Sequence, residues 1–363
     1  MDTKAFSVDV IPDWEGFLSN IRREGTPSRV HFIELFLDAE IQDVIGDRYH
    51  LLESLARSDQ YYGLKRQVIL QRFLGYDYVR CGVEGIEMSF KRLTTDDTSA
   101  LQRSEGRHYA EEHTGPITNW DEFEKYPWPD PSKATTVALE WYQENLPDGM
   151  CIIGSGGFGH FFEWLSWLMG YETLCFALFD NRQLVEAICE RILEINTQII
   201  NRLLEFDRVK MVWASDDLGF RSGTLISPND LREFILPLHK KMADAAHKSG
   251  RPYLLHSCGN LSAIMDDLIC GVGIDGKHSF EDVIEGPVTA KEKYGDRIAL
   301  LGGIDVDFLC RADEEQIRRE VREVLGKCLP GGGYCLGTGN SVANYIPVDN
   351  YLAMLDEGRR FCM

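Results

Sequence analysis

The feature that most constrains the fold is a repeated alternation of short, apolar, β-rich runs with longer segments of helical periodicity. The runs lie at residues 30–35, 76–84, 151–157, 210–217, 252–258, 272–279, 298–305 and 334–339. Eight strand-then-helix units are the pattern of an α/β protein of the TIM (β/α)8 barrel type, which needs about 250 residues or more. The sequence therefore predicts such a barrel.

The rest of the chain is expected to elaborate this barrel. Residues 1–28 predict an N-terminal extension with one short helix at 14–23, and residues 29–363 predict a single barrel domain. Within it, residues 85–149 are rich in turn formers and aromatics, with hairpin-like pieces and a helix near 136–145. We expect this stretch to be an insertion after the second strand that lies over the mouth of the barrel.

Composition narrows the class of partner. The net charge of -20 disfavours nucleic acid and anionic membranes, which both reward clustered Lys and Arg. The ten cysteines are scattered, which favours buried or metal-binding thiols over a disulfide framework. Residues 1–16 lack the features of a secretory signal, so we expect a cytoplasmic protein. The most apolar window, 161–179, contains Glu163 and Glu172 and predicts a packed helix pair.

Polar residues follow many of the predicted strands, and the active site of a TIM barrel lies at the C-terminal ends of its strands. The residues at these positions are Glu34, Glu84, Ser155, Gly156, Gly157, Asp216, Asp217, His256, Cys258, His278, Asp305 and 335–340. They form the set of candidate site residues.

Three of these candidates could bind a metal. His256, Cys258 and Cys335 supply the minimum of three protein ligands for a zinc site with an open fourth position. Because the fifth and eighth strands are not neighbours, the three side chains would have to converge across the barrel mouth. The alternative is that the cysteines pack as small hydrophobes and that His256 makes a structural hydrogen bond.

The remaining candidates each have a functional and a structural interpretation. Asp216 and Asp217 could contact substrate or transfer a proton, or serve as helix caps. Glu34 could be a fourth zinc ligand or a substrate contact, or purely structural. In the glycine-rich stretch 154–160, which lacks the residues of a nucleotide-binding loop, Phe158 and His160 could line a wall for a flat substrate or belong to the core.

The motif HSCGN at 256–260 is followed by Cys335, within PGGGYCLGTGNSV, with 76 residues between Cys258 and Cys335. This pattern resembles the zinc motif of the methylcobamide methyltransferases. These enzymes belong to the uroporphyrinogen decarboxylase superfamily, whose fold is a TIM barrel. Stretches at 215–237, 300–309 and 346–354 resemble the same superfamily, so that the resemblance covers residues 28–361.

The resemblance implies that His256, Cys258 and Cys335 hold Zn²⁺. It also implies a methyl transfer between a small methylated substrate, or a thiol acceptor, and the cobalt of a corrinoid. None of the nine histidines has an Asp two residues before it, so the Asp-x-His-x-x-Gly motif of corrinoid-binding modules is absent. We therefore expect a separate corrinoid protein as partner.

Two alternatives remain. The decarboxylases bind the carboxylates of a porphyrinogen with an arginine-rich N-terminal segment, whereas this chain has only Arg22, Arg23 and Arg29 near that region. Asn340, a candidate substrate contact, stands where the decarboxylases carry a late histidine. Decarboxylation of a tetrapyrrole is thus the first alternative. The second is a non-catalytic barrel that binds a corrinoid protein or a small ligand.

Overall fold

A curled, parallel β-sheet forms the centre of the molecule in the computed structural model, which describes residues 5–103, 105–111 and 113–361. Its seven strands follow the order β1-β4-β5-β8-β9-β10-β11, and every neighbouring pair is parallel. The strands are β1 (Tyr78–Cys81), β4 (Cys151–Gly154), β5 (Val209–Ser215), β8 (Tyr253–His256), β9 (Gly276–His278), β10 (Ala299–Leu301) and β11 (Tyr334–Cys335). Most of their residues are buried on both faces, as expected of a parallel sheet covered by helices.

Seven of the eight predicted strands are thus confirmed, and the first differs. Residues 30–35 form only the isolated parallel bridge Phe32–Leu336, with Ile33 N donating to Leu336 O at 2.9 Å. On the side facing β1, the amide of Glu34 donates instead to the Tyr78 hydroxyl at 2.8 Å. A side chain therefore takes the place of a backbone partner, and no ladder forms between this segment and β1.

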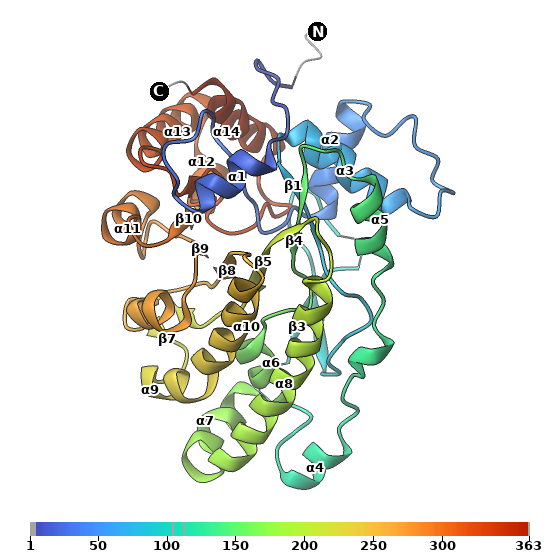
Figure 1. Ribbon diagram of the computed structural model, residues 1–363, viewed down its shortest axis with the longest axis vertical. Helices are drawn as coiled ribbons and strands as arrows, with labels where there is room; N and C mark the ends of the chain where they lie inside the picture. The colour runs from blue at the N-terminus through green and yellow to red at the C-terminus, as the bar shows by residue number, and fades with distance from the viewer. Residues whose placement is uncertain (1–4, 104, 112, 362–363) are drawn as a thin grey trace.

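Helices lie outside the sheet and follow its strands (Figure 1). They are α2 (Ala39–Arg48), α3 (Tyr62–Leu74), α6 (Phe161–Met169), α7 (Tyr171–Asp180), α8 (Arg182–Leu203), α9 (Pro228–Asp230), α10 (Leu236–Lys248), α11 (Pro287–Tyr294), α12 (Val306–Arg311), α13 (Glu314–Cys328) and α14 (Val348–Arg360), with π-helical turns η2 (Leu231–Ile235) and η3 (Asp267–Val272). The amphipathic α13 shows the local logic: Asp313 and Gln316 form a capping box, and Ile317, Val321 and Leu325 face the core.

The predicted short helix near the N-terminus is confirmed as α1 (Trp14–Ile21). The Asp13 carboxylate caps it by accepting from Gly16 N at 3.0 Å. Its last turn lies against β11, where Asn20 O accepts from Gly333 N at 2.9 Å. In this way α1 covers the end of the sheet where the strands begin.

Residues 85–149, which were predicted to be an insertion, contain the hairpin β2 (Arg92–Thr95) with β3 (Arg107–Ala110), α4 (Trp120–Lys125), the 3₁₀ turn η1 (Pro131–Lys133) and α5 (Val137–Asn145). Two arginines tie its hairpin region to segments that follow strand ends. Arg103 pairs with Asp38 at 2.5 Å, and Arg107 donates to Asn344 Oδ1 at 2.5 Å. Both contacts lie on the side of the sheet where the strands end.

The apolar window forms the expected helix pair, because Gly170, at φ 78°, separates α6 from α7. Figure 1 shows α6, α7 and α8 at the end of the molecule opposite both chain termini. Within the described residues, no helix is both long and apolar enough to cross a membrane.

Candidate metal centre

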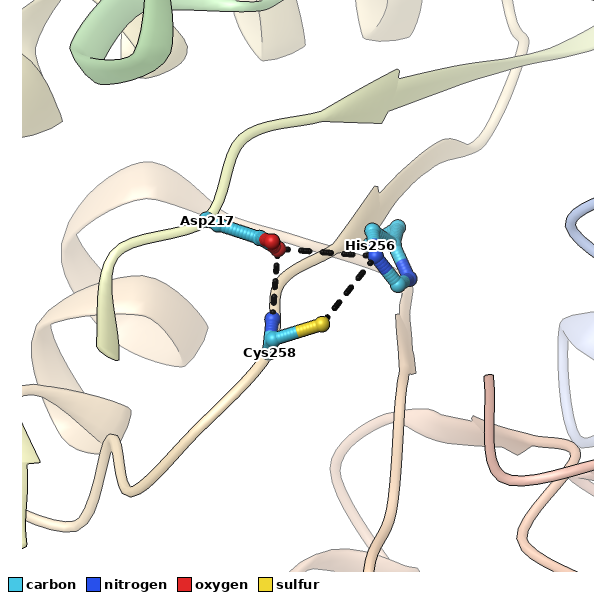
Figure 2. A group of neighbouring side chains, drawn as sticks. All are labelled: Asp217, His256 and Cys258. Carbon is cyan, nitrogen blue, oxygen red and sulfur yellow. Dashed lines mark hydrogen bonds and ion pairs between the residues drawn. The ribbon is translucent and has the colours of Figure 1, made fainter. Parts of the chain in front are cut away.

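Three potential ligand atoms meet where β5 and β8 end. Asp217, His256 and Cys258 each offer one ligand atom, and these atoms lie within 4.8 Å of one another (Figure 2). His256 Nε2 is 3.5 Å from Asp217 Oδ1 and 3.5 Å from Cys258 Sγ. One nitrogen, one sulfur and one oxygen ligand form a donor set that zinc accepts.

The parallel register of the two strands produces this cluster. Ser215 of β5 lies opposite His256 of β8, and Asp216 N donates to His256 O at 3.0 Å. The next residue, Asp217, then faces the loop after β8, where its Oδ1 accepts from Cys258 N at 2.9 Å. The backbone of both strands therefore fixes the carboxylate beside the histidine and the thiol.

A tight backbone contact holds the loop that carries Cys258. Gly259 has φ +82°, and a Cβ atom there would lie 2.2 Å from the carbonyl carbon of Gly219. Gly219 belongs to the short ribbon β6 (Gly219–Phe220) and β7 (Gly223–Thr224). Asn260 N donates to Phe220 O at 2.9 Å, so the loop packs directly against the ribbon.

His278, at the end of β9, orients the imidazole of His256. The two Nδ1 atoms are 2.7 Å apart, so one must carry a proton and the other accept it. Burial lowers the pKa of His278 to about 3 and that of His256 well below its usual value, with neighbouring charges acting in the same direction. Both rings are therefore neutral. If His256 Nδ1 carries the shared proton, its Nε2 is left as a free lone pair that faces Asp217 and Cys258.

The sulfur of Cys258 accepts from Asn340 Nδ2 at 3.3 Å. Burial raises the pKa of the Cys258 thiol, and the Asp217 carboxylate raises it further, whereas the Asn340 amide acts in the opposite direction. Without a cation the thiol is thus protonated at neutral pH. A bound metal would reverse this preference, because metals bind the thiolate form.

The structure does not bring Cys335 to this cluster, contrary to the predicted convergence across the mouth. Cys335 is fully buried in β11, and its sulfur accepts from Asn20 Nδ2 of α1 at 3.3 Å. Cys335 ends β11, but isolated bridges at Leu336 and Thr338 continue the pairing beyond the strand, and only Asn340, five residues after Cys335, contacts the cluster. Asp217 takes the third position in the cluster.

The two consecutive aspartates have different environments. Asp216 is fully buried, and its two oxygens accept from Phe162 N and Glu163 N at 2.9 Å each. His239 Nε2 lies 2.9 Å from the same carboxylate. Asp216 therefore caps α6 from outside that helix, as expected if its role is structural. Asp217 instead faces Cys258.

Glu34 lies outside the cluster and binds Thr338 through both of its oxygens. Oε1 accepts from Thr338 N at 2.8 Å, and Oε2 accepts from Thr338 Oγ1 at 2.6 Å. Burial raises the pKa of Glu34 to about 8, and the bonds to Thr338 only partly oppose this. The side chain borders a cavity of about 500 Å³, so contact with a bound molecule stays a prediction.

The two aromatic candidates also differ. Phe158 is 1% exposed and packs edge-on against Tyr253, so it belongs to the core. His160 is partly exposed, stacks on Trp164, and has its Nδ1 2.7 Å from Glu163 Oε2. Burial opposes protonation of His160, but the bond to Glu163 prevails and raises its pKa.

Arg80 is a residue that the predictions missed. It lies on β1 inside the barrel, where its guanidinium covers the Trp213 ring at 4.8 Å and its Nε donates to Ser155 Oγ at 3.2 Å. The available signal was a single basic residue in the middle of the run 76–84, between Asp77 and Glu84 near its ends.

Residues 109–361 match the uroporphyrinogen decarboxylase (URO-D) family, and this match spans well over half of the chain. The chain therefore belongs to the uroporphyrinogen decarboxylase family, which confirms the resemblance seen in its sequence.

Individual relatives carry two different names. A methylated-thiol–coenzyme M methyltransferase from Methanosarcina mazei is 33% identical over 134 residues, which are 36% of this chain and 33% of the relative. A uroporphyrinogen decarboxylase from Pseudoalteromonas atlantica is 24% identical over 302 residues, which are 74% of this chain and 76% of the relative. The chain thus matches only a third of the length of the methyltransferase.

Among solved structures, a methyltransferase from Methanosarcina mazei superposes with a TM-score of 0.64 at 19% identity. The superposition covers 95% of this chain and 97% of the other. This likeness extends over almost the whole chain and concerns the fold.

Proposed function

We propose that the protein is a zinc-dependent methyltransferase that moves a methyl group between a small methylated substrate, or a thiol acceptor, and the cobalt of a separate corrinoid protein. The observation that carries this proposal is the cluster of Asp217, His256 and Cys258. The name of the Methanosarcina mazei relative, a methyltransferase, also supports methyl transfer as the reaction. We also infer that residues 30–35 complete a (β/α)8 barrel through the bridge of Phe32 to Leu336, the residue that follows β11.

The spacing of the cluster fits zinc. Tetrahedral bonds of about 2.1 Å to nitrogen and oxygen and about 2.3 Å to sulfur place neighbouring ligand atoms about 3.5 Å apart. His256 Nε2 is 3.5 Å from both of its partners. The three side chains would hold Zn²⁺ and leave a fourth position open, as in catalytic zinc sites.

When bound, zinc would lower the pKa of a thiol or hydroxyl and present it as a nucleophile. The protein's own residues would supply the rest. His278 would keep His256 in the tautomer that binds metal through Nε2, and Asn340 would donate to the Cys258 thiolate. The amide of Cys258 would hold the Asp217 carboxylate in place.

Cys258 and Cys335, the two cysteines of the predicted zinc motif, provide a matched test of zinc binding. We expect purified wild-type protein to contain about one zinc ion per chain. Cys258→Ala should lose this zinc, whereas Cys335→Ala should retain it, because only Cys258 lies in the cluster. Metal analysis would be combined with anaerobic methyl transfer to cob(I)alamin, using methoxyaromatics, methylamines and methyl thiols as donors.

Two results would contradict the proposal: wild-type protein without zinc, or a Cys258→Ala variant that keeps both its zinc and its methyl transfer. Decarboxylation of a tetrapyrrole makes a different forecast, since it predicts formation of coproporphyrinogen from uroporphyrinogen in metal-free protein. A non-catalytic barrel would bind a ligand and show no turnover with any of the donors.

A further inference from the structure

Lys277 is a buried cation beside the candidate metal centre. It lies on β9, the neighbour of β8, and its side chain is 5% exposed. Its Nζ donates to Ser279 O at 2.6 Å and to Ser257 O at 3.4 Å. Ser257 stands between the candidate ligands His256 and Cys258 in the chain. The ammonium group is therefore held against the segment that carries two of the three ligands.

The ammonium group of Lys277 has no carboxylate partner among the described residues. Glu281 and Glu285 line the same cavity, of about 230 Å³, but neither accepts a hydrogen bond from it. Glu285 pairs instead with Lys293 of α11. The Phe280 ring lies 4.5 Å from Nζ and covers it on one side. Because a buried cation without a counter-ion is costly, additional negative charge nearby would stabilise it.

Lys277 nonetheless carries its charge at neutral pH. Burial lowers its pKa to about 8, and negative charges around it act in the opposite direction. These charges belong to Cys258 in its thiolate form, Asp217, Glu281 and Glu285. Two of the four are candidate metal ligands, so the ammonium group lies within electrostatic range of the metal centre.

The charges of the candidate metal centre balance without Lys277. Zn²⁺ would be neutralised by the Cys258 thiolate and the Asp217 carboxylate, because the imidazole of His256 is neutral. An anion that enters the open fourth position would then bring an uncompensated negative charge into a buried site. Of the charged groups around that site, Lys277 is the cation that has no acid of its own.

The proposed reaction forms such an anion. When a methyl group passes from a thioether to Co(I), the electron pair of the broken C–S bond stays on sulfur and leaves a thiolate. Cobalt supplies the pair of the new Co–C bond and becomes Co(III). In the reverse direction, an acceptor thiol must lose its proton before its sulfur can attack the methyl group. Both directions therefore place negative charge at the site.

We propose that Lys277 is the counter-charge for this anion, so that the open position of the metal centre prefers a thiolate or a similar anionic group to a neutral ligand. This inference rests on the proposed function and deepens it by naming the charge that the open position accepts. Lys277 is a positioning residue in this role, because it holds a charge beside the site and does not bind the reacting atoms.

The test uses the full chain with Co²⁺ in place of Zn²⁺, because the absorption bands of Co²⁺ change when a ligand enters its coordination sphere. Two probes are titrated: 2-mercaptoethanol, which binds as a thiolate, and imidazole, which binds as a neutral ligand. The variants are Lys277→Met, which removes the charge and keeps the length of the side chain, and Lys293→Met as a matched control. Lys293 lines the same cavity but is paired with Glu285.

We expect Lys277→Met to bind 2-mercaptoethanol about 10-fold more weakly at neutral pH, which is the effect of one charge several ångströms away at an effective dielectric constant of about 20. In a pH series, the apparent pKa for thiolate binding should rise by about one unit in this variant. Imidazole binding should change by less than about 3-fold, and Lys293→Met should alter neither probe, because a paired, exposed charge has little effect.

Two outcomes overturn the proposal. Lys277→Met could bind the thiol as tightly as the wild type does, or it could lose affinity for the thiol and for imidazole equally, which would indicate a purely structural role. If Lys277→Met does not fold, Lys277→Gln removes the same charge and keeps a donor for Ser279 O, and unchanged thiol binding there would contradict the proposal equally. Lys277→Arg keeps the charge and should bind the thiol more tightly than either neutral variant.

Metal content and methyl transfer separate this inference from the proposed function. A chain that binds neither Zn²⁺ nor Co²⁺ contradicts both. A metal-loaded chain that transfers no methyl group contradicts the proposed function alone, and a selective loss of thiol affinity in Lys277→Met would then still support the role of Lys277. Methyl transfer with unchanged thiol binding in Lys277→Met contradicts only the role of Lys277.

Discussion

The two ends of the curled sheet contain the same kinds of residue, which have hydrogen-bond and ion-pair partners at one end and fewer of them at the other. Where the strands begin, Asp77 is fully buried and binds both Arg29 and His31, and Cys335 accepts from Asn20. Where the strands end, Asp217, His256 and Cys258 gather with Arg80 nearby, and Arg80 has no acid to pair with among the described residues.

The two ends differ in how many of their buried polar atoms have hydrogen-bond partners. At the first end, Asp77 Oδ1 also accepts from Asp13 N at 2.6 Å, and His31 Nδ1 is 2.7 Å from Oδ2. At the other end, His278 Nε2 and Trp213 Nε1 are buried without partners in the described part of the chain. Aspartate, histidine, cysteine and arginine therefore stabilise the fold at one end and are available to a ligand at the other.

The largest effect expected from this contrast is on Asp77. Asp77→Ala leaves Arg29 and His31 without their buried partner, and should lower the free energy of unfolding by about 3–5 kcal/mol. Zinc content should not change in the protein that remains folded. Urea denaturation with metal analysis measures both quantities.

Asp217→Ala is the matched variant at the other end, and it should show the reverse: loss of zinc with a small change in stability. The contrast between the two ends would be broken if Asp77→Ala released zinc while Asp217→Ala kept it.

A smaller effect is expected for Asp216, which is adjacent to the cluster but satisfied. Asp216→Ala removes the acceptor of two amides of α6 and the partner of His239, and should cost about 2–3 kcal/mol of unfolding free energy. Zinc binding should persist. If Asp216→Ala lost its zinc while its stability was unchanged, Asp216 would support metal binding and not the fold.

The smallest effect concerns Glu34 and pH. Its pKa is about 8 in the folded protein and near the ordinary value of 4.5 in the unfolded chain, so the folded state binds the extra proton between these values. Its contribution to stability is fully present below about pH 4.5 and is lost as the pH rises through about 8. In Glu34→Gln, the decline of unfolding free energy between pH 5 and 8 should be shallower by about 1 kcal/mol or more.

Denaturation at several pH values, with the exposed Glu84→Gln as control, measures this slope. An unchanged slope in Glu34→Gln would indicate that Glu34 is ionised in the folded protein, and that it is available as a counter-ion for Arg80.

The sequence was sufficient for most of the fold, because strand and helix periods are local properties. It predicted seven strands of the central sheet, the helix α1 and the α6–α7 pair. It did not predict that the Tyr78 hydroxyl would accept a hydrogen bond from the Glu34 amide, in place of a ladder between residues 30–35 and β1. That contact joins side chain to backbone between distant segments and has no local signature.

The site was predicted in part, for a similar reason. A residue at the end of a strand lies near the site, but its side chain can point toward the site or away from it, because successive side chains on a strand alternate in direction. This distinguishes Asp217, which faces Cys258, from Asp216, which faces α6. Cys335 was misplaced because the chain continues through bridges at Leu336 and Thr338 before Asn340 contacts the cluster, and the Cys335 sulfur lies beside Asn20 of α1.

The hydrogen bonds that Asp216 accepts from α6 connect the candidate metal centre to that helix. Asp216 and Asp217 are consecutive, so a backbone shift at Asp217 should also weaken the hydrogen bonds that Asp216 accepts from Phe162 N and Glu163 N. Helix α6 carries Trp164, on which His160 stacks at the mouth. Hydrogen exchange at these two amides therefore reports, from a helix that supplies no ligand, how firmly the carboxylate is held.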